Sequence, residues 1–392
     1  MPLTRRRAPL GHRLRLGMVG GGQGAFIGAV HRYAARLDDR YELVAGAFAS
    51  TPERSRSSAA ALGVAPDRAY GNFAEMAAAE AARDDGIDVV SIVTPNHLHY
   101  PVAKAFLEAG IHLICDKPLT TNLADAIALA RLVEESGLVF VLTHNYTGYP
   151  MVRQARAMVE AGELGRIRTI QVEYAQDWMT RRLEAEGQKQ AEWRADPARS
   201  GPGGCVTDIG THAHNLVRFA TGLEVESLCA ELTTFVEGRA LDDNVQMLLR
   251  FEGGARGALW ASQVAPGNEN ALKLRVYGEK AGLAWSQEDP NYLHYTPFGE
   301  PPRLIRRGGS GADPAAAHAS RIPAGHPEGY LEAFATIYSD AAELIRASIE
   351  GREPDKDARL VPTVRDGVRG VALIEAAVAS ASRGESWIKM GA

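Results

Sequence analysis

The stretch LRLGMVGGGQGA, at residues 14–25, decides the fold. Its first six residues are mostly apolar, as in a buried strand, and a glycine run follows at once. An apolar helix pattern then extends from about Ala25 to Leu37. Strand, glycine turn and helix in this order predict the phosphate-binding turn of a dinucleotide-binding unit, although a tight turn in an unrelated α/β protein has the same pattern.

The glycine turn reads as G-x-G-x-x-A, and each position has a physical task. Gly20 permits the tight turn, Gly22 lets the backbone approach a pyrophosphate, and Ala25 lets helix and strand pack closely. Free N–H groups at the start of the helix favour a phosphate. We therefore expect a dinucleotide to contact Gly20, Gly22, Gln23, Ala25 and Phe26.

Strands and helices keep alternating up to about residue 145. Strands are expected at 14–19, 42–48, 87–93, 111–115 and 138–142, and helices at 25–37, 53–62, 98–109 and 122–136. Five strands separated by helices and short loops predict a doubly wound parallel sheet with helices on both faces. Its ligands should lie beyond the carboxyl ends of the strands.

The pattern changes after about residue 145. A helix is expected at 150–161, a long loop at 299–328, helices at 330–350 and 363–382, and strands at 167–175, 226–236, 245–251, 257–263, 271–277 and 282–286. The short alternating segments predict a largely antiparallel sheet with one solvated or partner-covered face. The predicted organisation is a flexible tail at 1–12, a Rossmann domain at 13–145 and a C-terminal domain at 146–392.

Composition and charge narrow the function classes. The 392 residues suffice for two or three domains, and 45% hydrophobic with 23% charged residues exclude a disordered chain. A net charge of −5 argues against general nucleic-acid binding. The chain has no apolar run of membrane-span length, and its basic N-terminus lacks the apolar region of a secretory signal. Three distant cysteines, Cys115, Cys205 and Cys229, indicate reduced thiols and a cytoplasmic protein.

The end of the second predicted strand bears on the choice between NAD and NADP. An Asp or Glu there would bind the ribose hydroxyls of NAD, but this strand ends in Phe48-Ala49-Ser50-Thr51. Ser50 together with the nearby Arg54 suits a 2′-phosphate and favours NADP. An exposed position on a helix explains Arg54 equally well, so NAD stays open.

Two histidines follow the third predicted strand, in Thr94-Pro95-Asn96-His97-Leu98-His99. Both are explained as ordinary polar loop residues. A metal pair would lack a third and a fourth ligand nearby, so no metal site is predicted.

Two further clusters suit acid–base chemistry. Lys117, in Cys115-Asp116-Lys117-Pro118 after the fourth strand, would lie beside a cofactor cleft, where an amine can transfer protons; a structural salt bridge is the alternative. Asp208 and His212 have the spacing i, i+4, which places both on one face of a helix, so that the carboxylate can orient the imidazole. A capped helix with a surface histidine is the alternative there.

Together these motifs resemble those of the Gfo/Idh/MocA oxidoreductase family. The resemblance covers about residues 14–290 and rests on the glycine loop, TPNHLH (94–99), the lysine motif, HNYTGYP (144–150) and GGCVTDIGTH (203–212). It implies an α/β fold with an N-terminal Rossmann domain and a C-terminal α/β domain that has an open, mostly antiparallel sheet. It also implies NAD or NADP as the cofactor, a sugar, glycoside or cyclitol as the substrate, and a homodimer or homotetramer formed through that sheet.

The resemblance also assigns roles to individual residues. It implies that His212 takes the proton of the reacting hydroxyl, that Asp208 supports His212, and that Lys117 binds the substrate oxygen. The implied cofactor contacts are Thr94, Pro95, Asn96, His99, Asp116, Asn145, Trp193 and Arg194, with Tyr146 beside the substrate. Asp116 stands where the family usually has Glu, so its cofactor contact is expected to differ.

The polar stretch 176–200 is expected to line the substrate pocket. Trp178 suits a sugar ring, and arginines such as Arg181 suit a carboxylate, sulfonate or phosphate. The hypothesis is a pyranoside substrate, including an anionic one; the alternative is that these charges are solvated.

Three functions compete. The first is an NAD(P)-dependent dehydrogenase or reductase acting on a sugar, glycoside or inositol. The second is an NAD-dependent oxidoreductive glycosidase, which recycles its cofactor through oxidation, elimination, water addition and re-reduction, with His214 or Tyr146 as an extra acid. The third is a non-enzymatic cofactor-binding regulator, against which the presence of Lys117, Asp208 and His212 argues.

Overall fold

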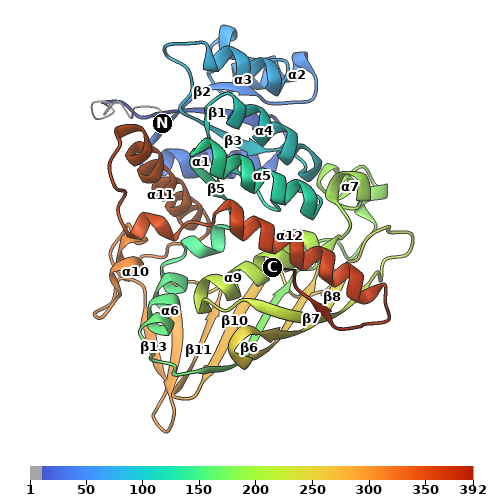
Figure 1. The fold of residues 1–392 in the computed structure, drawn as a ribbon, viewed down its shortest axis with the longest axis vertical. Coiled ribbons are helices and arrows are strands. Elements are labelled where there is room, and N and C mark those ends of the chain that lie inside the picture. Colours follow the sequence, from blue (N-terminus) through green and yellow to red (C-terminus); the bar gives the residue numbers. More distant parts are fainter. Residues whose placement is uncertain (1–10, 392) are drawn as a thin grey trace. The chain divides into compact units, whose positions relative to one another are not determined.

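A computed structural model describes residues 11–391, so the expected tail at 1–12 lies almost entirely outside the described residues. The chain divides into two compact units, drawn as ribbons in Figure 1. The first unit contains the residues up to Thr120 together with 124–148 and 330–367. The second contains 121–123, 149–329 and the residues from Val368 onward.

The first unit is built on a five-stranded parallel sheet, as predicted. Its strands are β1 (Leu14–Gly20), β2 (Tyr41–Ala47), β3 (Val89–Val93), β4 (His112–Cys115) and β5 (Phe140–Leu142). They are arranged in the order β2-β1-β3-β4-β5, and every neighbouring pair is parallel. All five residues of β3 are buried, as expected for a central strand with helices on both faces.

The helices of this unit follow the predicted alternation, with one addition. They are α1 (Phe26–Leu37), α2 (Pro52–Ala61), α3 (Phe73–Ala81), α4 (His99–Glu108), α5 (Leu123–Ser136) and α11 (Tyr330–Glu350), with short turns η1 (Pro66–Arg68), η2 (Asn96–Leu98), η3 (Asn145–Gly148) and η7 (Asp357–Leu360). Helix α3 was not predicted. It begins at an Asn72 cap, whose side chain accepts from the backbone N–H of Glu75 at 2.9 Å.

The predicted C-terminal domain at 146–392 was wrong for residues 330–367, which belong to the first unit. Helix α11 buries Phe334 and Tyr338 in the core that also contains Leu14 and Val30. The apolar face of α11 is therefore completed by the Rossmann core rather than by its neighbours in sequence. Helix α12 (Val364–Ala381) begins in the first unit and continues in the second.

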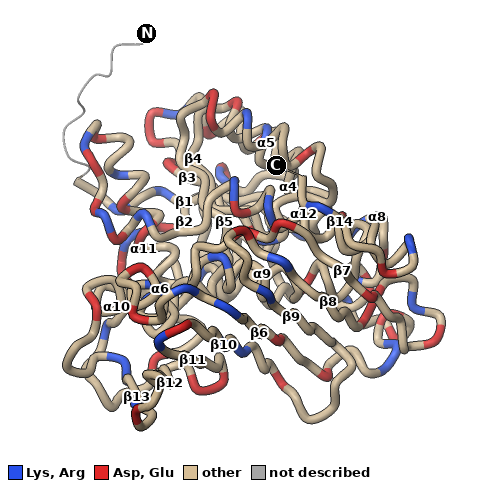
Figure 2. Tube along the Cα trace, turned by 60° about the horizontal axis from the view of Figure 1, so that its bottom comes forward, with Lys and Arg blue, Asp and Glu red and all other residues tan. Residues whose placement is uncertain are grey.

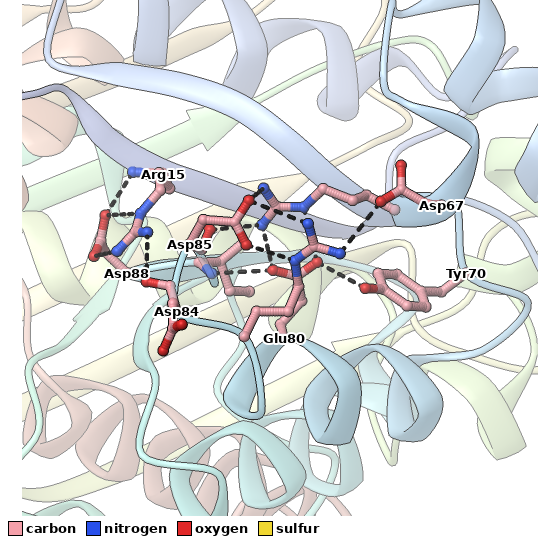
Figure 3. Close-up of polar contacts among 10 residues, drawn as sticks. Arg15, Asp67, Tyr70, Glu80, Asp84, Asp85 and Asp88 are labelled. Atoms are coloured by element: carbon pink, nitrogen blue, oxygen red, sulfur yellow. Dashed lines mark hydrogen bonds and ion pairs between the residues drawn. The ribbon is translucent and has the colours of Figure 1, made fainter.

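A buried ion-pair network joins α3 to neighbouring segments of the first unit (Figure 3). The fully buried Glu80 accepts from Arg68 Nε at 3.0 Å, from Tyr70 Oη at 2.8 Å and from the backbone N–H of Ile87 at 3.1 Å. Close by, Asp88 accepts from the guanidinium of Arg15 at 2.9 Å. Each charge has a partner of opposite sign, which a buried ion requires.

The second unit is built on a nine-stranded, mostly antiparallel sheet, as predicted. Its strands are β6 (Ile167–Ala175), β7 (Val225–Thr233), β8 (Asn244–Phe251), β9 (Arg256–Ser262), β10 (Ala271–Gly278), β11 (Ala281–Ser286), β12 (Tyr292–Pro297), β13 (Arg303–Arg306) and β14 (Ile388–Lys389). Their order is β13-β12-β11-β10-β6-β9-β8-β7-β14, and β6 runs parallel to β9. The long loop expected at 299–328 was wrong in part, because β13 adds an edge strand to β12 there.

The two faces of this sheet differ. Helices α6 (Pro150–Glu160) and α9 (Thr211–Thr221) contact one face, on which Tyr174 and the paired Ala261 are buried. The opposite face, called the outer face here, carries Glu173 and the paired Trp260. Figure 2 shows charged residues along its strands, and Glu173 pairs with Lys273 at 3.1 Å. The remaining elements are η4 (Leu183–Ala185), α7 (Lys189–Arg194), α8 (Pro197–Ser200), η5 (Val206–Gly210), η6 (Glu252–Gly254) and α10 (Pro314–His318).

The three cysteines are free thiols, and Cys115 and Cys205 are buried. Burial raises the pKa of both of these thiols, so they are unreactive apolar packing groups. Among residues 11–391, none of the helices combines the length and apolarity needed to cross a membrane.

Candidate active site

The predicted site residues fall into two groups, one within each unit. The first group surrounds the glycine loop at the end of β1. Gly20 has a φ of +80°, and a side chain on it would meet the carbonyl oxygen of Val93 at 2.6 Å, so only glycine fits. A close approach between α1 and the loop occurs at Gly28, and the contact expected of Ala25 stays a prediction. Ala25 is the half-buried residue before α1, whereas a Cβ on Gly28 would lie 2.4 Å from the carbonyl oxygen of Gly21.

Neighbouring elements hold the glycine loop in place. The backbone N–H of Gly22 donates to the carbonyl oxygen of Phe48 at the end of β2, at 3.2 Å. The backbone N–H of Gln23 donates to Ser58 Oγ on α2 at 3.1 Å, and Arg32 on α1 donates to the carbonyl oxygen of Gly21 at 2.6 Å. Sequence reasoning missed Ser58 and Arg32. Ser58 could have been recognised as a hydroxyl side chain on the apolar face of α2.

The residues after β2 were expected to distinguish NAD from NADP. Ser50 and Arg54 are both exposed, and Thr51 caps α2 through the backbone N–H of Arg54. No Asp or Glu stands between Phe48 and Pro52. A hydroxyl and a guanidinium are therefore the polar groups available at this strand end.

The segment after β3 contains a histidine with a different role from the one expected. His99 is fully buried; its Nδ1 lies 2.7 Å from the carbonyl oxygen of Pro118 and its Nε2 lies 3.0 Å from that of Thr94. Burial lowers the pKa of His99. His99 is therefore neither a polar loop residue nor half of a metal pair, but a link between the ends of β3 and β4. His97 is exposed, Asn96 is buried and Pro95 is half-buried.

Among the buried polar atoms of this unit without a hydrogen-bond partner in residues 11–391, two follow strands of the parallel sheet. They are Thr94 Oγ1, after β3, and Asn145 Nδ2, in η3 after β5. Unsatisfied buried polar groups are costly and point to an absent partner. Both residues were predicted to contact a cofactor. Together with the glycine loop, they fit a dinucleotide bound across the carboxyl ends of these strands. Tyr146 is buried, and its ring lies 6.5 Å from that of Tyr330.

Lys117 stands between two fixed neighbours at the end of β4. Asp116 Oδ1 accepts from the backbone N–H of Lys117 at 3.0 Å and from Thr143 Oγ1 at 2.9 Å. On the other side, the bond between Lys117 and Pro118 is cis, and the carbonyl oxygen of Pro118 is held by His99. The Lys117 side chain is half-buried. The backbone at Lys117 is thus anchored on both sides.

The second group, in the second unit, surrounds η5, which is a single π-helical turn. Asp242, which is buried, accepts from the backbone N–H of Gly204 at 2.6 Å and from that of Val206 at 2.9 Å. Burial raises the pKa of Asp242 to about 6. Gly204 has to be glycine because a Cβ there would lie 2.2 Å from the carbonyl oxygen of Asp242. Sequence reasoning missed Asp242, since it lies 38 residues from the turn that it holds.

Asp208 and His212, the predicted i, i+4 pair, lie on either side of the junction between the π turn and α9, and their expected contact stays a prediction. Asp208 lies in the π turn and His212 lies in α9, so the helical register changes between them. Asp208 Oδ2 accepts from Arg194 Nε at 3.1 Å and from Gln263 Nε2 at 2.9 Å. The ring of His212 lies 6.2 Å from that of Tyr174. π turns of this kind are frequent at functional sites.

Arg194 and Arg181, two of the arginines in 176–200, have different surroundings. Arg194 pairs with Asp208 and stacks 4.2 Å from the centre of the Trp193 ring and 5.9 Å from that of Trp178. Arg181 lines a pocket of about 630 Å³ with Trp260. This pocket opens on the outer face of the sheet, whereas Tyr174 and His212 lie on the other face. The predicted substrate contact of Arg181 stays a prediction.

Within residues 11–391, no group of three or more His, Cys, Asp or Glu side chains is arranged to hold a metal ion.

Comparison with known proteins identifies the relatives of both units. A family model described as the oxidoreductase family with an NAD-binding Rossmann fold matches residues 14–144, and the GFO/IDH/MocA C-terminal domain matches residues 152–284. An oxidoreductase from Sinorhizobium meliloti with a known crystal structure is 56% identical, with a TM-score of 0.88, over 96% of this chain and 99% of that chain.

Two further relatives extend this result. An inositol dehydrogenase homolog from Azotobacter vinelandii, complexed with NADH and myo-inositol, is 37% identical, with a TM-score of 0.89, over 97% of this chain and 98% of that chain. The uncharacterized oxidoreductase YfiI of Bacillus subtilis is 36% identical over 96% of both chains.

Proposed function

The chain belongs to the GFO/IDH/MocA family of NAD(P)-dependent oxidoreductases, and from this premise we propose that it transfers hydride between the nicotinamide and a hydroxyl-bearing carbon of a neutral sugar, glycoside or cyclitol. The observation that carries the proposal lies within the first unit. The glycine loop and Lys117 both stand at carboxyl ends of the same parallel sheet, the edge where such sheets bind ligands.

The bound nicotinamide would supply the hydride acceptor or donor. Toward it, the chain contributes the glycine loop for the pyrophosphate and the partnerless Thr94 Oγ1 and Asn145 Nδ2 for polar groups. Lys117 then donates a hydrogen bond to the substrate oxygen, which holds the reacting carbon in place and stabilises negative charge on that oxygen.

The second unit contributes the base. We propose that His212 takes the proton of the reacting hydroxyl and returns it in the reverse direction. Asp208 is held by Arg194 and Gln263, so its carboxylate is fixed beside the start of α9 and stabilises a positive charge on His212. Trp178 offers an aromatic face to the sugar ring. The pairing of Arg194 with Asp208 and the place of Arg181 favour a neutral substrate over an anionic one.

Matched variants test these roles. His212→Ala and Lys117→Ala should each lower kcat by about 10²–10⁴-fold, the usual contribution of a positioned acid or base. The exposed His97→Ala serves as the histidine control and should keep full activity. NADH affinity, measured by fluorescence, should change little in His212→Ala. Full activity in His212→Ala would exclude this residue as the base.

The cofactor preference follows from the end of β2. We propose that the protein accepts NADP as well as NAD, because Ser50 and Arg54 are exposed and no acid faces the 2′ position. Arg54→Glu should raise the KM for NADP by at least about tenfold, since it replaces attraction of the 2′-phosphate by repulsion. The KM for NAD should stay unchanged. Equal effects on both cofactors would place Arg54 away from the 2′ position.

We also propose that copies of the chain associate through the outer face of the nine-stranded sheet. Leu248 and Tyr277 on this face are 57% and 44% exposed, and exposed apolar patches are typical of protein–protein interfaces. Light scattering on the purified protein should show a dimer or tetramer, and Leu248→Glu should shift it toward the mass of one chain. A wild-type monomer would contradict this.

A further inference from the structure

A buried polar chain lies behind the loop that carries Lys117, entirely within the first unit. His31, on α1, is fully buried. Its Nδ1 lies 2.8 Å from Tyr338 Oη on α11 and 3.2 Å from Ser91 Oγ on β3. The two hydroxyl oxygens lie 2.8 Å from each other. One imidazole thus joins three elements of the unit through polar contacts in an otherwise apolar core.

The other ring nitrogen of His31 faces Asp116. His31 Nε2 has no hydrogen-bond partner among the described residues and lies 4.0 Å from Asp116 Oδ1. The same oxygen accepts from the backbone N–H of Lys117 and from Thr143 Oγ1. An unsatisfied nitrogen in a fully buried side chain is rare, and here it lies 4.0 Å from the carboxylate beside Lys117.

The surroundings of His31 fix where its proton sits. Burial lowers the pKa of His31 to about 4, with Arg32 and His99 acting in the same direction and Asp116 in the opposite direction. The ring is therefore neutral near pH 7 and carries one proton. A proton on Nε2 faces the carboxylate, whereas a proton on Nδ1 would leave a lone pair facing that negative charge. The carboxylate therefore selects the Nε2–H form.

With the proton on Nε2, the remaining bonds acquire a direction. Nδ1 is then an acceptor, so the hydroxyl of Tyr338 donates to it at 2.8 Å. The hydroxyl of Ser91 in turn donates to Tyr338 Oη. The chain runs from Ser91 through Tyr338 and His31 toward Asp116, with every donor directed toward the carboxylate.

We propose that His31 is a positioning residue for Lys117. Its Nε2–H orients the Asp116 carboxylate. That carboxylate accepts from the backbone N–H of Lys117 and so fixes the backbone that carries the Lys117 side chain. His31, Tyr338 and Ser91 touch no reacting atom and act through Asp116. This inference rests on the role proposed above for Lys117 and extends it to a core network that none of the motifs contains.

Nuclear magnetic resonance tests the proton position without any substrate. The full chain is labelled with ¹⁵N-histidine, and the His31 signals are assigned by their loss in His31→Gln. At pH 7, the two-bond couplings should show a neutral ring protonated on Nε2. A neutral ring protonated on Nδ1, or an imidazolium, would overturn the proposal. This readout stands even if the dehydrogenase activity is not found.

Kinetics test the action through Asp116. His31→Leu should lower kcat about tenfold or more with NADH affinity unchanged, because a shift of the lysine by 1 Å can cost that much. His31→Gln, which places an amide N–H near the position of Nε2, should recover most of the activity. In an Asp116→Asn background, His31→Leu should cause no further loss, since the two act in series. Additive losses would overturn the proposal.

A matched pair of tyrosine variants separates positioning from stability. Tyr338→Phe removes the hydroxyl that donates to His31, whereas Tyr41→Phe removes a buried hydroxyl that donates to the backbone oxygen of Tyr338 at 2.6 Å. Both should lower the melting temperature, but only Tyr338→Phe should lower kcat. Equal losses of kcat would show that the network is merely structural. This pair also carries the test if His31→Leu does not fold.

Discussion

Replacing His31 with Gln should remove part of the acid sensitivity of the first unit. Burial lowers the pKa of His31 to about 4 in the folded protein, whereas a histidine in the unfolded chain titrates near 6.5. The unfolded chain therefore binds more protons between these two values. The free energy of unfolding accordingly falls as the pH falls through this range, and the stabilisation is fully present only above about pH 6.5.

The magnitude follows from the two pKa values. At pH 5 the unfolded side chain is almost fully protonated and the folded one about one-tenth protonated, so stability falls by about 2 kcal/mol relative to pH 7. His112 adds a similar amount, because burial lowers its pKa to about 4 as well. The two histidines together should therefore cost about 4 kcal/mol, and His31→Gln should halve that loss.

Urea unfolding at pH 7 and pH 5, followed by far-ultraviolet circular dichroism, measures this difference. Tryptophan fluorescence is the wrong probe for it, because the five tryptophans all lie in the second unit: Trp178, Trp193, Trp260, Trp285 and Trp387. His112→Gln is the matched control and should give the same reduction independently. An unchanged pH dependence in His31→Gln would refute a neutral, buried His31.

Three further perturbations have defined outcomes. Glu80→Ala leaves the buried Arg68 charge without its partner and should destabilise the first unit by about 3–5 kcal/mol in a dichroism melt, whereas the exposed Glu75→Ala should cost little. Gly28→Ala places a Cβ 2.4 Å from the carbonyl oxygen of Gly21 and should lower the free energy of unfolding by about 1–3 kcal/mol. The variant should also bind NADH more weakly in a fluorescence titration. Unchanged binding would mean that the loop does not hold the cofactor. Asp242→Asn leaves one of the two bound backbone N–H groups facing the side-chain NH2 group. The variant should lower the free energy of unfolding of the second unit by about 1–3 kcal/mol, measured by tryptophan fluorescence, and should lower kcat. A wild-type kcat would show that η5 is not needed for catalysis.

The parallel sheet could be predicted because its signals are local. Each of its five strands is a short apolar run bounded by turn residues, and alternation with helices determines the topology. The place of α11 could not be predicted in this way. Its apolar face shows that it packs on a core, but the choice between Leu14 and the C-terminal sheet depends on contacts about 320 residues away along the chain.

The candidate site shows the same limit. Lys117, Asp208 and His212 stand in recognisable motifs, whereas the groups that hold them come from distant segments without a motif. Asp242 reaches Gly204 across 38 residues, and Tyr338 reaches His31 across 307. The π turn that precedes α9 could not be predicted either, because no local residue pattern distinguishes it from an α-helical turn.

The measurement that most directly tests hydride transfer uses the purified protein with NAD⁺ or NADP⁺ against myo-inositol, free sugars and nitrophenyl glycosides. Reduced cofactor and released nitrophenol are recorded in the same sample, with His212→Ala alongside. Hydride transfer as proposed predicts reduced nicotinamide in step with oxidised substrate, no nitrophenol, and neither signal from the variant. Cofactor-dependent release of nitrophenol without net reduced cofactor would contradict it and establish a redox-neutral glycosidase instead.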